Sequence, residues 1–162
     1  IIHQTGEKDF EYVRTEYERL GITAEVAPFF DKMEQRYAAA TLSVSRAGGT
    51  TLAELSCAGI PTLLVPYPHA AENHQEKNAD EIVSAGGGLK ILDRDVVGLL
   101  GDTVAGLMSD EDRLGQMAQA CGKLGKPEAL ASILQVLCQI SGEELGAVEL
   151  QATETPCTGE KN

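Results

Sequence analysis

Strand-like segments alternate with helical segments along most of this chain, and that alternation restricts the fold more than any other feature. Short runs of apolar and β-branched residues lie at 1–5, 23–27, 41–45, 62–65 and 89–92. Helical periodicity occurs at 9–20, 31–39, 51–58, 74–85, 96–108, 111–124 and 128–140. Strands that alternate with helices pair in parallel, because each crossover returns the chain to the same end of the sheet. The pattern therefore predicts an α/β fold, a Rossmann-like parallel sheet with flanking helices.

In such a sheet, ligands bind outside the carboxyl ends of the strands. Three loops are expected at that edge, after Ala27, after Ser45 and after Val65. The last of these follows the sequence Thr-Leu-Leu-Val, which is typical of a central strand buried on both faces. The side chains that are suited to bind a ligand lie in these loops or in the first turns of the helices that follow them.

Composition excludes several classes of function. The chain has 162 residues, with 13 Lys and Arg against 25 Asp and Glu, a formal net charge of −12. This acidic balance argues against a nucleic-acid partner, which requires basic side chains gathered on one face. No apolar run approaches the roughly 20 residues that span a bilayer. The cysteines are too widely spaced for a zinc or redox motif, and we expect neither a metal nor another cofactor.

Residues 1–140 are expected to form one domain, and residues 141–162 an acidic, mobile tail. The tail segment is rich in Glu, Thr and Gly and lacks periodicity. The chain opens with Ile1 inside a strand-like run, without a methionine, a basic start or a cleavage site before it. We therefore expect a piece of a longer protein, with function shared between this piece and the remainder.

The strongest candidate site is a glycine turn between the third strand and its helix. Gly48 and Gly49 let the backbone approach a ligand, and the helix start presents free N–H groups. Thr50 and Thr51 add hydroxyl donors, which suits a phosphate or diphosphate. Glu54 lies one turn after Thr51 on the same face and suits the diol of a ribose. The alternative is a plain glycine turn whose acidic residue complements the helix dipole.

The loop after the second strand carries Pro28, Phe29, Phe30 and Asp31. The two aromatic rings are suited to stack on a planar base, and the backbone between them to pair with the edge of that base. The alternative is that both rings belong to the core or form a hydrophobic staple for a helix that begins at Asp31.

The loop after the fourth strand is dense in groups that bond to hydroxyls. Asn73, His74 and Gln75 offer both donors and acceptors without a net charge, the mixture that sugar hydroxyls need. The alternative is a polar loop in which Asn73 caps the next helix. His69, Glu72 and His74 fit no common zinc spacing, so a metal is not expected here.

Taken in order, these stretches resemble the C-terminal half of the MurG family, N-acetylglucosaminyltransferases of peptidoglycan synthesis. The resemblance runs to about residue 140. It rests on five stretches: His3-Gln4-Thr5-Gly6; Phe29-Phe30-Asp31-x-Met33; Ser45-Arg46-Ala47-Gly48-Gly49-Thr50-Thr51-Leu52-Ala53-Glu54; Gly59-Ile60-Pro61; and Val65-Pro66-Tyr67-Pro68-His69-Ala70-Ala71-Glu72-Asn73-His74-Gln75-x-x-Asn78-Ala79. The family has the GT-B fold, in which two Rossmann-like domains face each other and the C-terminal one holds a UDP-sugar.

The resemblance implies a role for each candidate residue. Phe29 would cap the uracil, and the backbone of Phe30 would pair with its edge. The glycine turn and both threonines would meet the diphosphate, and Glu54 the ribose. His74 and Gln75 would hold the N-acetylglucosamine. Two further positions, Arg46 and Asn78, match the family pattern and are candidates without a settled role.

The resemblance also implies partners and a place in the cell. The full enzyme would transfer GlcNAc from UDP-GlcNAc to the lipid I acceptor, giving lipid II with inversion. The N-terminal domain would hold the lipid acceptor and the catalytic base, so no catalytic residue is expected in this chain. The full enzyme would meet the membrane surface. The enzyme would be cytoplasmic and peripheral on the inner face of the bacterial membrane.

Three other functions stay open at this point. The first is a stand-alone donor-binding subunit of a split GlcNAc transferase. The second is an isomerase of the UDP-GlcNAc 2-epimerase type, which would need acid–base carboxylates beyond Glu54. The third is a UDP-sugar-binding module without catalysis.

Overall fold

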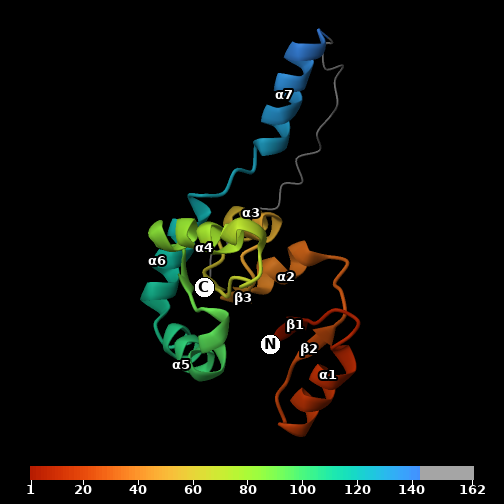
Figure 1. Ribbon diagram of the computed structural model, residues 1–162, viewed down its shortest axis with the longest axis vertical. Coiled ribbons are helices and arrows are strands. Elements are labelled where there is room, and N and C mark those ends of the chain that lie inside the picture. The colour runs from red at the N-terminus through yellow and green to blue at the C-terminus, as the bar shows by residue number, and fades with distance from the viewer. Residues whose placement is uncertain (143–162) are drawn as a thin grey trace, which may run out of the picture. The chain divides into compact units, whose positions relative to one another are not determined.

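The computed structural model describes residues 1–142, an α/β chain in which every strand pairing is parallel. The chain divides into two compact units, Ile1–Ala39 and the part from Ala40 onward (Figure 1). The predicted tail lies outside the described residues, apart from Ser141 and Gly142 at the end of the last helix. No helix in this described part is long and apolar enough to cross a membrane.

The first unit is a strand–helix–strand crossover followed by a short helix. Its elements are β1 (Ile2–Gln4), α1 (Phe10–Arg19), β2 (Glu25–Ala27) and α2 (Met33–Ala39). His3 lies opposite Val26 in the parallel ladder. The Nδ1 atom of His3 lies 3.1 Å from the hydroxyl oxygen of Tyr17, and the two rings meet edge to face. Helix α1 is thereby fixed against β1.

The second unit is a three-stranded parallel sheet with the strand order β3-β4-β5. Its elements are β3 (Ser43–Ser45), α3 (Gly49–Ala58), β4 (Thr62–Leu64), η1 (Ala71–Asn73), α4 (His74–Ser84), β5 (Gly88–Lys90), η2 (Asp93–Asp95), α5 (Val96–Met108), α6 (Glu111–Gly122) and α7 (Ala129–Ser141). The predicted order of strands and helices is confirmed. The predicted single sheet is two separate ladders, because β1 pairs only with β2, and β3 only with β4, within residues 1–142.

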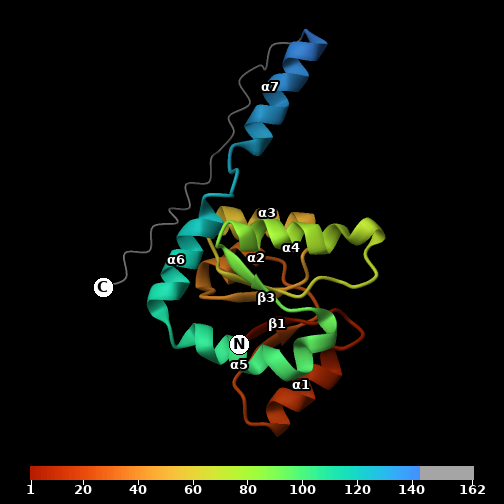
Figure 2. The same cartoon turned by 60° about the vertical axis from the view of Figure 1, so that its left-hand side comes forward.

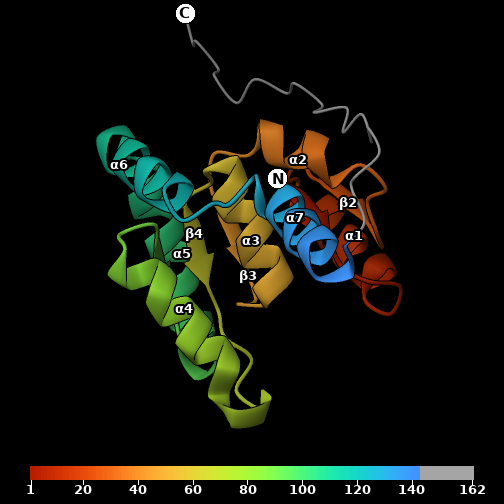
Figure 3. The ribbon, with the colours of Figure 1, turned by 90° about the horizontal axis from the view of Figure 1, so that it is seen from above.

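The core of the second unit lies on both faces of its sheet. Helices α3 and α4 cover one face and α5 lies on the other (Figure 2). The first face is filled by Ala47, Leu52, Leu64, Ala79 and Ile82, and the second by Leu107, Leu114 and Met117 with Leu42 and Leu89 against them. All of β4 is buried, as expected for a central strand. Helix α6 packs against both α5 and α3 (Figure 3).

The start of β5 differs by one residue from the prediction, which began this strand at residue 89. Gly88 is the first residue of the strand and lies opposite Thr62 of β4. A Cβ atom at this position would come within 2.5 Å of the Thr62 hydroxyl oxygen and 2.6 Å of the Thr62 carbonyl oxygen. The glycine is therefore required by close packing within the sheet rather than by a turn.

Candidate functional site at the strand ends

The three strands of the second unit end level with one another at a single edge. Ser45 lies opposite Leu64, and Leu64 lies opposite Lys90. Each strand leads directly into a segment that carries polar side chains. The glycine turn follows β3, a loop beginning at Val65 follows β4, and Asp93 opens the short helix after β5. The candidate residues of this unit are thus gathered at the edge where parallel sheets bind ligands.

The glycine turn presents an open helix start, as predicted. Gly48 is the N-cap of α3 with extended backbone and no side-chain capping bond, and its carbonyl accepts from Leu52. The first N–H groups of a helix have no acceptor within it. A Cβ atom at Gly49 would meet nothing within 4 Å, and one at Gly48 only the Thr51 hydroxyl at 3.8 Å. Gly49 and Thr50 are also exposed, so the positive end of the helix dipole lies at the surface, where an anion can bind.

The other predicted residues on α3 lie around the same helix start. Thr50 and Glu54 are exposed, and Thr51 is half-buried. Thr51 and Glu54 are three residues apart in one helix, which places them on one face. The arrangement can offer hydroxyl donors and one carboxylate acceptor to the same ligand.

Asn78 serves the protein itself. Its side-chain Nδ2 donates to the carbonyl oxygen of Ala47, 3.1 Å away. Ala47 is fully buried and immediately precedes the glycine turn. Asn78 therefore ties helix α4 to the turn from behind, instead of facing a ligand with that amide nitrogen.

The loop before α4 has a strained backbone that orients two predicted sugar-binding residues. Glu72 and Asn73 both have left-handed φ angles, 51° and 54°. Asn73 occupies the N-cap position of α4, but its side chain makes no capping bond. The Nδ1 atom of His74 lies 2.8 Å from the carbonyl oxygen of Ala71. Because a carbonyl only accepts, Nδ1 carries the proton, and Nε2 of the neutral ring remains an acceptor.

One of the two polar groups of the Gln75 amide bonds to the loop that follows β4. Its Oε1 atom accepts from the backbone N–H of Tyr67 at 3.0 Å. The sequence pattern predicted an amide that both donates to and accepts from a sugar. The structure leaves the NH₂ group of Gln75 for donation and places its oxygen on the protein backbone.

Arg46 reaches across the sheet edge. Its Nη1 atom lies 3.2 Å from the carbonyl oxygen of Val65, 3.4 Å from that of Pro66 and 2.5 Å from Oδ1 of Asp93. Its guanidinium carbon lies 5.6 Å from the centre of the Tyr67 ring. The sequence pattern left the role of Arg46 open, included Tyr67 in the loop motif without a role, and did not single out Asp93. The position of Asp93 directly after a predicted strand was the available signal.

Phe29 and Phe30 belong to the first unit and have different surroundings. Phe29 is 64% exposed, which leaves its ring free to stack. The Phe30 ring lies under the Arg36 guanidinium at 4.8 Å, and Arg36 also pairs with Glu25 at 2.6 Å. The N–H of Phe30 donates to Oε1 of Gln4 at 3.1 Å. A base edge that pairs with this N–H would have to replace the Gln4 side chain.

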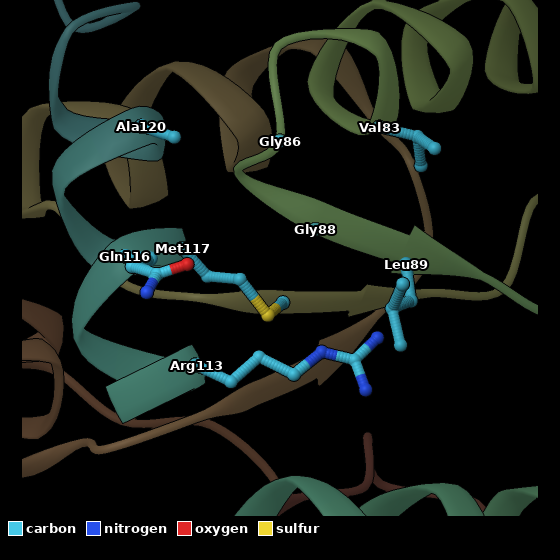
Figure 4. A pocket seen from close by; sticks show the side chains of 8 residues that line it. All are labelled: Val83, Gly86, Gly88, Leu89, Arg113, Gln116, Met117 and Ala120. Carbon is cyan, nitrogen blue, oxygen red and sulfur yellow. The ribbon is translucent and has the colours of Figure 1, made fainter. Parts of the chain in front are cut away.

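A hollow of about 410 Å³ lies elsewhere in the second unit, between the end of α4, β5 and α6. Arg113 and Met117 extend from α6 toward Leu89 of β5 (Figure 4). Its lining includes Gly88 at the start of β5, whereas the residues described above lie beyond the ends of the strands. Its lining is mainly apolar, with Arg113 and Gln116 as the polar side chains.

A lysine salt-bridge cluster, also missed by the sequence pattern, holds α4 to β5. Lys90 lies 2.5 Å from Oδ1 of Asp80 and 3.4 Å from Oε1 of Glu76. The hydrogen bond to Asp80 is the main reason that the pKa of Lys90 is raised above its ordinary value. Because Lys90 is the last residue of β5, this cluster lies close in sequence to the site.

A parallel α/β domain with an open glycine turn and helix start at its strand ends is a phosphate- or nucleotide-binding class of protein. The family model described as glycosyltransferase family 28 C-terminal domain matches residues 1–133. The chain belongs to this family. The resemblance drawn from the motifs is thereby confirmed.

Curated relatives carry the name UDP-N-acetylglucosamine–N-acetylmuramyl-(pentapeptide) pyrophosphoryl-undecaprenol N-acetylglucosamine transferase. One from Anaeromyxobacter dehalogenans is 42% identical over 95% of this chain and 40% of its own length. One from Geobacter sulfurreducens is 39% identical over 89% of this chain and 40% of its own length. The chain therefore spans about two-fifths of the relatives it matches.

The fold is also similar to a solved structure. The crystal structure of Acinetobacter baumannii MurG matches 86% of this chain and 42% of its own, with a TM-score of 0.77 and 25% identity. The predicted fold class, the C-terminal half of a GT-B glycosyltransferase, is confirmed by this likeness and by the family.

Proposed function

We propose that this chain supplies the UDP-GlcNAc site of an N-acetylglucosaminyltransferase that converts lipid I into lipid II. The observation that carries the proposal is the open start of α3, with no side-chain cap at Gly48 and free space beside Gly49. The names of the relatives support the choice of donor and acceptor. The motifs support the individual roles.

In this proposal, each part of the donor meets a separate group. The first-turn N–H groups of α3, with Thr50 and Thr51, hold the diphosphate, and Glu54 accepts from the ribose hydroxyls. On the support of the motifs alone, Phe29 covers the uracil and the N–H of Phe30 pairs with the edge of the base after it releases Oε1 of Gln4. The NH₂ group of Gln75 and the Nε2 atom of His74 meet hydroxyls of the sugar.

The proposed chemistry is direct displacement at the anomeric carbon with inversion. A base in the acceptor domain of the complete enzyme removes the proton from the attacking hydroxyl. The role of this chain is to stabilise the negative charge that develops on the departing UDP. Helix N–H groups and hydroxyls can do so because they are already oriented before the reaction. The acceptor lipid would bring the complete enzyme to the cytoplasmic face of the membrane.

Calorimetric titration of the purified chain with UDP and with uridine tests the proposal. UDP is expected to bind more tightly than uridine, because only UDP reaches the start of α3. Gly49→Ala should lower UDP affinity by about tenfold, or about 1.4 kcal/mol, because it places a methyl group where the diphosphate approaches. The fold should tolerate the change, since nothing lies within 4 Å of that position.

Gly101→Ala is the matched control, because it makes the same change on α5, where a Cβ atom also meets nothing within 4 Å. It should leave UDP affinity unchanged. Equal affinity for UDP and uridine, or an equal effect of both variants on UDP affinity, would contradict the proposal that the diphosphate binds at the start of α3.

A further inference from the structure

Arg46 is the side chain that contacts the segments following all three strands of the second unit. It stands directly after β3, its Nη1 atom bonds to the Val65 and Pro66 carbonyls after β4, and it pairs with Asp93 after β5. All three oxygen atoms lie around the single nitrogen Nη1 of Arg46. The planar guanidinium also packs on the Tyr67 ring, a contact that the compact ammonium group of a lysine would not reproduce.

The Arg46 contacts continue to the predicted sugar-binding helix. The Arg46 guanidinium packs on the Tyr67 ring, and the backbone N–H of Tyr67 donates to Oε1 of Gln75. Gln75 lies in the first turn of α4, after two residues with left-handed φ angles. A loop with such a backbone keeps its conformation only when its surroundings hold it. The contact chain Arg46–Tyr67–Gln75 provides that support.

The ion pair within this cluster is half-exposed. The Arg46 and Asp93 side chains are 50% and 40% exposed, and exposed pairs contribute only about 0.2–1 kcal/mol to stability. The main effect of the pair is therefore to orient the Arg46 guanidinium. Asp93 also places a carboxylate against the guanidinium, which lowers the attraction of Arg46 for an anionic ligand.

We infer that Arg46 is a positioning residue, held by Asp93, that fixes the Val65–Tyr67 turn and through it the Gln75 amide, and that it is not a diphosphate ligand. The inference rests on the proposed function for its effect on the sugar. The part of the inference that concerns the loop rests on the strand-end geometry alone. The two effects can be measured separately.

The first experiment measures the loop without any ligand. Hydrogen exchange of the Tyr67 amide, followed by NMR in the full chain, should be several-fold faster in Asp93→Asn and in Arg46→Lys than in the wild type. Asp95→Asn is the matched control. Asp95 lies in the same short helix, but it pairs with Arg94. Unchanged Tyr67 exchange in both test variants would overturn the inference, whether or not the chain binds UDP.

The second experiment measures donor recognition. Asp93→Asn should reduce the preference for UDP-GlcNAc over its 4-epimer by roughly three- to tenfold, the effect of a misplaced hydrogen bond, with UDP affinity within twofold of wild type. If Arg46 were instead a ligand of the diphosphate, Asp93→Asn should increase UDP affinity, because Arg46 would lose its pairing with the Asp93 charge and become available to the diphosphate. Tighter UDP binding with unchanged sugar preference would therefore overturn the positioning role. Absence of UDP binding in the wild type would overturn the proposed function, and the exchange of the Tyr67 amide would then decide whether Arg46 fixes the loop.

Discussion

The side-chain amide of Asn78 donates to the carbonyl oxygen of Ala47 across 3.1 Å, joining helix α4 to the residue before the glycine turn. Ala47 has no exposed surface, so water could not replace the Asn78 amide as the donor to its carbonyl. The position of the open helix start in the proposed donor site thus depends on a residue that lies 31 positions further along the chain.

Asn78→Ala should lower the free energy of unfolding by about 1–3 kcal/mol, because it leaves a buried carbonyl without a donor. Asn78→Asp should cost more, since a carboxylate oxygen would face the Ala47 carbonyl. Urea denaturation measures both. Glu81→Ala, an exposed change on the same helix, should stay within about 0.5 kcal/mol of wild type. Equal stability of Asn78→Ala and wild type would show that the Ala47 contact contributes nothing.

Glu54→Ala should weaken UDP binding by about 1–3 kcal/mol, the cost of losing charge-assisted bonds to two ribose hydroxyls. The comparison needs a second ligand, the 2′,3′-dideoxy form of UDP. Wild type should prefer UDP, and the variant should bind both nearly equally. A variant that still discriminates as well as wild type would show that Glu54 does not recognise the ribose.

Gly88→Ala should destabilise the second unit by about 1–3 kcal/mol, because the new methyl group would overlap the backbone and hydroxyl of Thr62. Gly101→Ala should act in the opposite direction, adding about 0.5–1 kcal/mol, since it lies open on helix α5. Thermal unfolding of the two variants beside wild type measures the contrast. If both changes shift the midpoint in the same direction, close packing at Gly88 is not the reason for its glycine.

Lys90 makes stability fall at alkaline pH. Its folded-state pKa is raised above 10.5, mainly by the hydrogen bond to Asp80 and further by Glu76. The stabilisation is fully present below pH 10.5 and is lost as pH rises through the folded-state pKa. Lys90→Met should therefore cost up to about 1 kcal/mol at neutral pH, and the gap from wild type should shrink above pH 10.5.

Chemical denaturation at a series of pH values up to the alkaline range measures that gap. Lys77→Met, an exposed change on α4, controls for the loss of one positive charge. If the stability difference between Lys90→Met and wild type stays constant across the alkaline range, the contribution of Lys90 does not depend on its charge.

Local patterns in the sequence predicted the order of strands and helices, the buried strand β4 and the glycine turn. Hydrophobic periodicity and glycine pairs act over a few residues, so the sequence carries them directly. The motifs also led to the family, because their residue types and spacing are specific in combination.

The tertiary structure alone decided which of the candidate residues bond to the protein itself. Arg46 finds Asp93 at a separation of 47 residues, Phe30 donates to Gln4 at 26, and Gly88 is required by Thr62 of the neighbouring strand. Such contacts join residues that are distant in the sequence, so they arise only after strands and helices pack together, and a pattern that extends over a few residues does not contain them. The sequence by itself therefore determined the fold class and the segments that carry the candidate site. The packing of the strand ends decided that Asn78 supports the glycine turn, and that Arg46 contacts the loop leading to Gln75.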